Sequence, residues 1–207
     1  MKPVITLVAA FLLLSTTGYC QSKTSKIPEE LITAFNGEVN ASAKYARYAE
    51  AARKENLLAI AKLFEATSKA ESIHAANHKR VLEVLGVTAG TPTINPFEVK
   101  TTAENLAEAI KGETYEFEKM YPAFLKTAES EKISEAIVSY RYALETEKRH
   151  AILYHTVLEK MQSEKTDAIP STWYVCPTCG NTYDSEGVKI SCEFCGTLKP
   201  RFLIFTS

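Results

Sequence analysis

The sequence predicts a mainly α protein: a four-helix bundle with one long crossover connection, followed by a small domain built around cysteines. Two observations predict this fold. From Ile27 to Met161, glycine and proline are scarce, and apolar residues recur at the three- and four-residue steps of amphipathic helices. From Thr166 onward the chain is rich in Pro, Gly, Thr, Tyr and Cys, which is typical of a separate, loop-rich module. We therefore place the helical domain at residues 27–165 and the cysteine domain at residues 170–207.

Four helices are expected in the first domain. They run from about Pro28 to Lys54, from Asn56 to Leu85, from Thr102 to Ala128 and from Lys132 to Gln162. Pro28 suits the first turn of a helix, and Gly86 suits the end of the second one. Residues 86–100, rich in Gly and Pro, form a long connection, whereas residues 129–131 form a short turn. Short, long and short connections are typical of the ferritin-like arrangement of a bundle.

The composition is that of an ordinary globular protein, with 207 residues of which 45% are hydrophobic and 24% are charged. The 24 Lys and Arg residues against 25 Asp and Glu residues give a formal charge of -1. No basic run exceeds a pair such as Lys148-Arg149, so the electrostatic basis for binding nucleic acid is missing.

The N-terminus has the layout of a secretory signal peptide, which we place at residues 1–20. A basic residue precedes an apolar run from Val4 to Leu14, and small or polar residues follow. The run is too short to cross a bilayer, which takes about 20 apolar residues. We favour cleavage after Cys20 over a lipid anchor on it, because bulky Tyr19 stands where an anchor signal wants a small residue. The mature protein is thus expected to be exported, periplasmic and without a stable membrane span.

Acidic residues and histidines fall on the apolar faces of all four predicted helices. An unpaired carboxylate in an apolar core costs several kcal/mol, and no Lys or Arg is expected to face inward beside these groups. Divalent metal ions are the simplest partners that neutralise them. The inward-facing residues are Glu38 on the first helix, Glu71, His74 and His78 on the second, Glu113 and Glu116 on the third, and Glu147 and His150 on the fourth.

This pattern occurs twice along the chain. Each half has a Gly-Glu pair, a later tyrosine, and a Glu-x-x-His motif 33 or 34 positions after the first Glu. Residues three apart share one helix face, so each motif offers an oxygen and a nitrogen to the same interior point. One Glu from each of two helices plus Glu-x-x-His from each of the others is the ligand set of di-iron carboxylate bundles. The two sets are Glu38, Tyr45, Glu71 and His74, and Glu113, Tyr121, Glu147 and His150.

Two Cys-x-x-Cys motifs, separated by twelve residues, lie in the C-terminal domain. In an exported protein cysteines normally form disulfides, but four thiolates at this spacing suit one tetrahedral zinc or iron ion. The aromatic residues that flank the motifs favour iron over a structural zinc ribbon. The four cysteines are Cys176, Cys179, Cys192 and Cys195.

From about Ile27 to the C-terminus, these motifs together resemble the rubrerythrin family, in which a ferritin-like di-iron domain is joined to a rubredoxin-like domain. The second cysteine motif departs from the commoner family form, because Glu193 replaces a Pro and Gly196 follows the fourth cysteine. His78 and His155 inherit no role, and we expect them to be core or surface residues. The resemblance implies that Glu71 and Glu147 bridge two irons, that Glu38, Glu113, His74 and His150 are the remaining ligands, that Glu116 joins or leaves with the oxidation state, and that Tyr45 and Tyr121 stand beside the ligands.

The resemblance also implies a function: reduction of hydrogen peroxide to water by the two irons, with electrons relayed by the cysteine-bound iron from an external donor that the sequence does not identify. A homodimer is implied as well, because in relatives the cysteine iron of one subunit approaches the di-iron site of another. Two alternatives stay open, a ferroxidase or iron-handling protein and a non-enzymatic metal-binding electron carrier. The sequence does not distinguish iron from manganese in the bundle.

Overall fold

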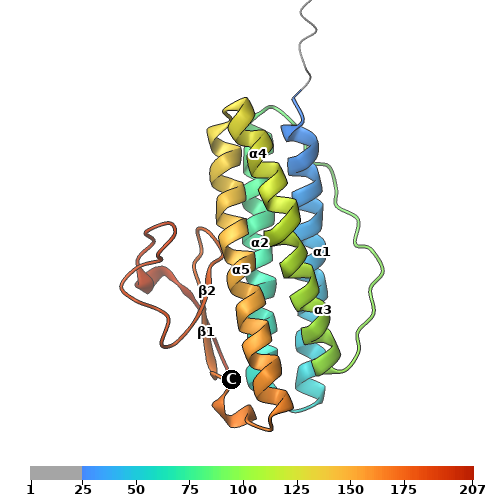
Figure 1. Ribbon diagram of the computed structural model, residues 1–207, viewed down its shortest axis with the longest axis vertical. Helices are drawn as coiled ribbons and strands as arrows, with labels where there is room; N and C mark the ends of the chain where they lie inside the picture. The colour runs from blue at the N-terminus through green and yellow to red at the C-terminus, as the bar shows by residue number, and fades with distance from the viewer. Residues whose placement is uncertain (1–24) are drawn as a thin grey trace, which may run out of the picture.

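The computed structural model describes residues 25–207 (Figure 1), so the predicted signal peptide lies outside the described residues. Long helices form an upright bundle, and a small sheet lies against one side of it. The helices of the bundle are α1 (Ile27–Lys54), α2 (Leu58–Val84), α3 (Thr102–Tyr115), α4 (Tyr121–Glu131) and α5 (Ser134–Gln162). The predicted ferritin-like bundle is confirmed. Along residues 25–207, no helix combines the length and apolar content that crossing a membrane requires.

Helices α3 and α4 form a single rod that a π-helical segment, Glu116–Met120, interrupts. The sequence predicted one regular helix here, ending at Ala128, and the predicted turn at residues 129–131 is wrong. Those residues extend α4 to Glu131, and the Ser130 hydroxyl donates to the Thr127 carbonyl at 2.8 Å within the helix. The chain reverses one residue later, because Lys132 adopts a left-handed conformation with φ 59° that ends the helix.

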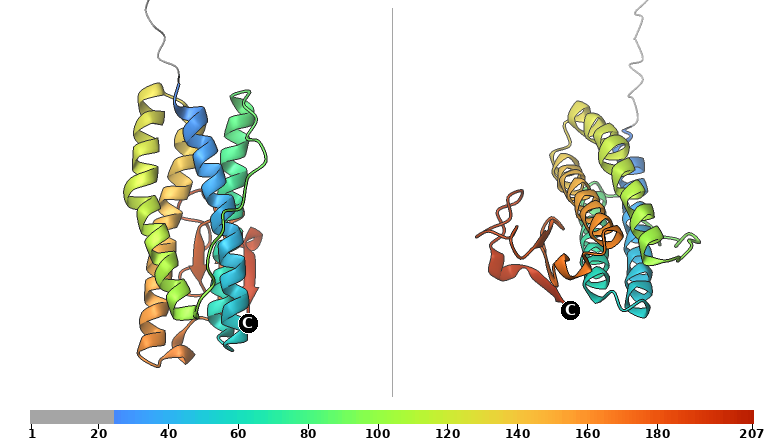
Figure 2. Two further views of the ribbon diagram at one scale, coloured as in Figure 1. Left: turned by 90° about the vertical axis from the view of Figure 1, so that its right-hand side faces the viewer. Right: turned by 60° about the horizontal axis from the view of Figure 1, so that its bottom comes forward.

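The connection from α2 to α3 runs along the outside of the bundle beside α1, from one end to the other (Figures 1 and 2). Asn40 of α1 fastens it: its amide nitrogen donates to the Thr93 carbonyl at 3.0 Å, and its oxygen accepts from the Asn95 N–H at 2.7 Å. Thr101 then caps α3, with Glu104 completing a capping box. This crossover makes α2 and α3 parallel, as the long connection predicted.

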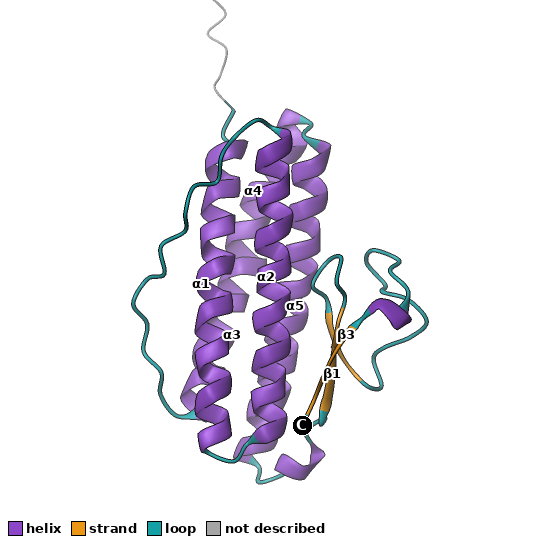
Figure 3. Ribbon diagram, turned by 180° about the vertical axis from the view of Figure 1, so that it is seen from behind, coloured by secondary structure: helices purple, strands orange, loops and turns teal. Residues whose placement is uncertain are grey.

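The C-terminal part forms a three-stranded antiparallel sheet in the order β2-β1-β3, from β1 (Thr172–Val175), β2 (Thr182–Asp184) and β3 (Leu203–Thr206). The sheet lies against α2 and α5 (Figure 3). Trp173 of β1 is 1% exposed, and its indole N–H donates to the Ala59 carbonyl of α2 at 3.2 Å. The cysteine domain is therefore docked onto the bundle and shares apolar core with it.

The bundle interior contains two apolar clusters with a polar layer between them. One cluster includes Phe64 and Tyr154, and the other includes Leu31 and Tyr140. The inward-facing acids and histidines lie between these clusters on every helix. The apolar clusters exclude water from both ends of this layer.

Candidate metal centres

Six carboxylate and imidazole side chains meet in the polar layer and form two overlapping groups. Within each group, one potential ligand atom from each residue lies within 4.8 Å of the others. All six side chains belong to residues that are at most 1% exposed. The groups are Glu38, Glu71, His74 and Glu147, and Glu71, Glu113, Glu147 and His150. Two residues, Glu71 and Glu147, belong to both groups, which is the arrangement expected of carboxylates that bridge two cations.

The individual oxygens of the shared carboxylates point in opposite directions. Glu71 places Oε2 2.9 Å from His74 Nδ1 and Oε1 3.0 Å from His150 Nδ1. Glu147 places Oε1 2.8 Å from His74 Nδ1 and Oε2 3.0 Å from His150 Nδ1. Each bridging residue therefore offers one oxygen to each half of the site.

The outer carboxylates divide between the two halves. Glu38 Oε1 lies 3.9 Å from His74 Nδ1, and Glu113 Oε1 lies 3.8 Å from His150 Nδ1. Each half thus holds one imidazole nitrogen, one outer carboxylate and one oxygen from each bridging carboxylate. This is the set of ligands predicted from the two sequence motifs.

Electrostatics show that this cluster needs cations. Burial and the nearby Glu71 raise the pKa of Glu38 to about 8, and burial raises the pKa of Glu147 well above its usual range. Although burial alone lowers it, hydrogen bonding with Glu71 raises the pKa of His74 to about 9. Among the described residues, both oxygens of each bridging carboxylate and Nδ1 of each histidine lack a hydrogen-bond partner. Orphaned buried donors of this kind fit a pair of divalent ions with a preference for oxygen and imidazole ligands, such as iron.

The cysteine domain fixes the tautomers of both histidines. His74 Nε2 lies 3.0 Å from the Cys179 carbonyl, which only accepts, so this nitrogen carries the proton. His150 Nε2 lies 3.0 Å from the Thr182 hydroxyl, which itself donates to the Gly180 carbonyl at 3.2 Å. His150 Nε2 therefore also donates, and both histidines keep the Nδ1 lone pair for a metal ion.

The two predicted tyrosines hold the outer carboxylates. The Tyr45 hydroxyl donates to Glu113 Oε1 at 2.6 Å, and the Tyr121 hydroxyl donates to Glu38 Oε1. Burial and the negative charge of Glu113 raise the pKa of Tyr45, and burial and Glu38 raise that of Tyr121. Both phenols therefore stay protonated and act as donors.

Glu116 lies outside both groups of ligand atoms. It is half-buried at the start of the π-helical segment. Burial and the charges of Glu38 and Glu113 raise the pKa of Glu116 well above its usual range, which shows how near it lies to the cluster. The structure places this predicted ligand beside the site and not in it.

His78 corrects one expectation and His155 confirms another. His78 is fully buried, its Nε2 lies 3.0 Å from the Tyr121 hydroxyl, and it lies 3.8 Å from Glu38 Oε1, so the expectation that it stands apart from the metal site is wrong. Burial lowers the pKa of His78 to about 3, which keeps the imidazole neutral. The four-residue spacing from His74 was the signal, because it repeats the same helix face one turn later. His155 is exposed on the surface, as expected.

The four cysteine sulfurs also form a cage. Cys176 Sγ lies 3.4 Å from Cys195 Sγ, Cys179 Sγ lies 3.5 Å from Cys192 Sγ, and none of the four forms a disulfide. A tetrahedral ion with metal–sulfur bonds of about 2.3 Å requires sulfur–sulfur distances of roughly 3.8 Å, close to those observed. Four thiolates at this spacing fit a single iron or zinc ion.

The two cysteine motifs share one turn geometry. Gly180 and Gly196 follow the second cysteine of each motif, with φ of +83° and +74°. Each glycine N–H donates to the carbonyl of the first cysteine of its motif, Cys176 or Cys192, at 2.9 Å. Gly196, which departs from the commoner family form, therefore reproduces the turn of the first motif.

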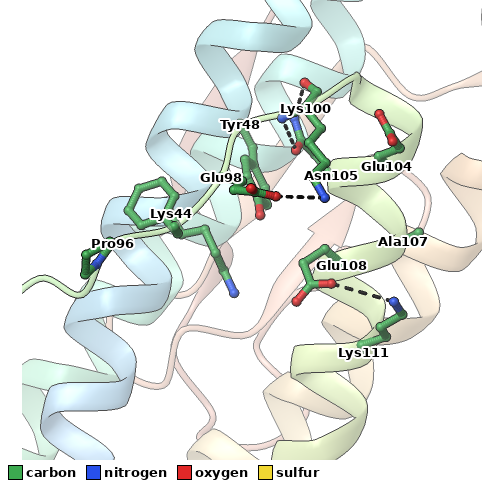
Figure 4. Close-up of a pocket in the computed structure, with 11 residues that line it drawn as sticks. Lys44, Tyr48, Pro96, Glu98, Lys100, Glu104, Asn105, Ala107, Glu108 and Lys111 are labelled. Carbon is green, nitrogen blue, oxygen red and sulfur yellow. Dashed lines mark hydrogen bonds and ion pairs between the residues drawn. The ribbon is translucent and has the colours of Figure 1, made fainter.

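A surface cavity of about 610 Å³ lies between α1, α3 and the crossover connection (Figure 4). Its charged side chains pair with one another: Lys100 with Glu98 at 2.9 Å, and Lys111 with Glu108 at 3.7 Å. None of its lining residues is among the predicted ligands. The chemistry of the molecule therefore lies in the bundle interior and the cysteine cage.

Comparison with known proteins gives consistent relatives. The rubrerythrin family model matches residues 29–158. Rubrerythrin-2 of Clostridium acetobutylicum is 34% identical over 88% of this chain and 98% of its own length. Nigerythrin of Nitratidesulfovibrio vulgaris is 32% identical over 86% of this chain and 85% of its own length.

Solved structures agree. The fully reduced, all-ferrous state of nigerythrin superposes with a TM-score of 0.79 at 30% identity, covering 91% of each chain. An open-pore ferritin from Archaeoglobus fulgidus superposes with a TM-score of 0.60 at 15% identity, a likeness of fold alone.

The two ligand sets and these relatives confirm the predicted cofactors, a di-iron site in the bundle and a rubredoxin-like site in the cysteine domain. Proteins of this kind are di-iron oxidoreductases of oxidative-stress defence. The chain belongs to the rubrerythrin family.

Proposed function

We propose that the protein is a non-haem di-iron peroxidase, which reduces hydrogen peroxide to water with electrons that pass through the cysteine-bound iron. The observation that carries the proposal is the 3.0 Å hydrogen bond from His74 Nε2 to the Cys179 carbonyl. It joins a ligand of one metal site to a ligand residue of the other through a single hydrogen bond. A non-redox binding site has no need of such a link.

The bound irons would supply redox chemistry, so that two electrons and two protons convert one peroxide molecule into two water molecules. The chain supplies the positioning. Glu71 and Glu147 hold the two metal positions together, and Tyr45 and Tyr121 fix the outer carboxylates. Glu116, beside the cluster, is the carboxylate proposed to join or leave as the oxidation state changes.

Electron delivery is proposed to occur within one chain, because the cysteine domain docks on α2 and α5 of its own bundle. The family resemblance also implies a homodimer with delivery between subunits. Mixing chains that lack the cysteine ligands with chains that lack the bundle ligands separates the two routes: activity restored in the mixture requires delivery between chains, and an inactive mixture supports delivery within one chain.

Export to the periplasm is also proposed, since the apolar run at residues 4–14 has the composition of a signal peptide. N-terminal sequencing of the mature protein is expected to begin at Gln21. A mature protein that begins at Met1, or that carries lipid on Cys20, contradicts the proposal.

The experiment that tests the reaction is stopped-flow mixing of the anaerobically reduced, iron-loaded protein with either hydrogen peroxide or dioxygen. We expect peroxide to oxidise the di-iron site faster than dioxygen, with one peroxide consumed per pair of irons. Faster oxidation by dioxygen identifies a ferroxidase. If neither oxidant reacts, the protein is a metal-binding electron carrier.

A further inference from the structure

A chain of buried hydrogen bonds leads from the metal cluster across the bundle. It begins at Glu38 Oε1, which accepts from the Tyr121 hydroxyl. The Tyr121 oxygen lies 3.0 Å from His78 Nε2, and His78 Nδ1 lies 2.8 Å from the Ser139 hydroxyl. These four residues come from α1, α4, α2 and α5, and none is more than 5% exposed. Each helix of the bundle thus contributes one member.

The direction of every hydrogen bond in this chain follows from its inner end. A metal-binding carboxylate only accepts, so Tyr121 spends its one hydroxyl proton on Glu38. The Tyr121 oxygen must then accept from His78 Nε2. Nδ1 of the neutral imidazole accepts in turn, so the Ser139 hydroxyl donates to it. All donors therefore point toward the metal cluster.

The outer end of the chain reaches solvent. Ser139 lines a cavity of about 330 Å³ between α2 and α5, which Arg80, Glu135 and Tyr142 also line. Glu135 is exposed, so water and a charged carboxylate stand at the entrance. The chain thus connects an aqueous cavity to an otherwise dry interior.

The other half of the bundle lacks such a chain. Tyr45 donates to Glu113 as Tyr121 donates to Glu38, but the position equivalent to His78, four residues after His150, is Tyr154. The Tyr154 hydroxyl pairs with Thr67, and no hydrogen bond among the described residues joins it to Tyr45. The relay is therefore built on one side only, at the outer carboxylate Glu38.

We propose that Ser139, His78 and Tyr121 form a proton relay that supplies Glu38. The proposal rests on the proposed function, because peroxide reduction consumes one proton for each electron inside a water-excluding core. The Ser139 proton moves to His78 Nδ1, the Nε2 proton moves to the Tyr121 oxygen, and the Tyr121 proton moves to Glu38 Oε1. Cavity water returns a proton to Ser139, so each passage transfers one proton and leaves no net charge on the relay.

Kinetics test the relay in the iron-loaded protein. Ser139→Ala removes the outer donor, and we expect it to slow oxidation of the reduced protein by peroxide by roughly 10–100-fold and to raise the solvent deuterium isotope effect. Ser139→Thr keeps a hydroxyl and is expected to restore the rate. Thr67→Val, which removes the equivalent buried hydroxyl from the other side, is the matched control and is expected to leave both quantities unchanged. A Ser139→Ala variant with the normal rate and isotope effect overturns the relay.

A second measurement needs no activity. In the zinc-substituted, ¹⁵N-labelled protein, we expect the His78 ring to carry its proton on Nε2 and not on Nδ1, and this proton to exchange with water more slowly in Ser139→Ala. A proton on Nδ1, or an unchanged exchange rate, overturns the relay even if the enzyme is active. If the wild-type protein fails to reduce peroxide while both NMR results hold, it is the proposed function that fails, and the relay then supplies protons to a different reduction.

Discussion

Tyr45 of α1 donates to Glu113 of α3 at 2.6 Å, and the reciprocal bond runs from Tyr121 of α4 to Glu38 of α1. Each tyrosine therefore holds the outer carboxylate that belongs to the other half of the duplicated motif. The two halves interlock across the bundle, so neither outer ligand is positioned by its own helix alone. The metal site depends on the relative placement of α1 and the α3–α4 rod.

Removing either phenol hydroxyl is expected to weaken iron binding at one of the two positions. Tyr45→Phe and Tyr121→Phe each leave a buried carboxylate oxygen without its donor, and loss of a partner of this kind typically costs about 10–100-fold in metal affinity. Iron titration by calorimetry measures the loss. Only Tyr121→Phe is also expected to slow the reaction with peroxide beyond what the iron content explains, because only Tyr121 belongs to the proton relay. Equal kinetic losses in both variants would contradict this distinction.

Substitution of Gly180 is expected to break the contact between the metal sites. A Cβ at Gly180 would lie 2.5 Å from His74 Nε2, so alanine forces the cysteine domain away from α2. We expect Gly180→Ala to keep the cysteine-bound iron and its visible spectrum but to slow its reoxidation after peroxide is added. Gly196→Ala is the control: its φ of +74° imposes similar backbone strain, but nothing lies within 4 Å of the added Cβ. Equal rates in the two variants would show that the His74 contact carries no electrons.

Removing the metal ions is expected to make stability fall as pH rises. The pKa of Glu38 is raised from 4.5 to about 8 by burial, so between these values the folded chain keeps a proton that the unfolded chain has lost. The pKa of His74 is raised from 6.5 to about 9, so its contribution is present below pH 6.5 and is lost as pH rises through about 9. Both effects have the same sign, and each pKa unit is worth about 1.4 kcal/mol.

Urea unfolding of chelator-treated protein at pH 5, 7 and 9 measures this trend. The iron-loaded protein serves as the control, and its stability is expected to vary less over the same range because the metal ions balance the ionised carboxylates. A metal-free chain that grows more stable from pH 5 to pH 9 would contradict the burial of uncompensated acids. The lowered pKa of Glu71, about 2, acts only in a lower pH window and leaves this range unaffected.

The ligands could be predicted from sequence because each lies on a helix face with a regular period. Glu71 and His74 stand three residues apart, and Glu147 and His150 repeat the spacing, so periodicity alone turns all four inward. The cysteines were predictable for a similar reason, since both ligands of each motif lie within one turn. Local spacing determines these features, and sequence shows local spacing directly.

The π-helical segment was missed, although the sequence held a signal. Tyr45 follows Glu38 by seven positions, whereas Tyr121 follows Glu113 by eight. The π-helical turn at Glu116–Met120 absorbs the extra residue, which returns Tyr121 to the face that meets Glu38. A regular helix would rotate the phenol away from the carboxylate.

The docking of the cysteine domain could not be predicted. His74 and Cys179 are 105 positions apart, and no periodic pattern relates a helix face to a turn in another domain. The same holds for Ser139 and His78, which are 61 positions apart and whose polar contact is a product of helix packing. Contacts of this kind depend on how whole elements pack.

The central claim is that the buried acids and histidines hold two irons while the cysteines hold a third. Metal analysis together with a visible spectrum of the protein purified in air tests it most directly. The account predicts three irons per chain and the colour of a ferric tetrathiolate. Zinc in the cysteine cage together with a bundle that binds no metal would contradict it.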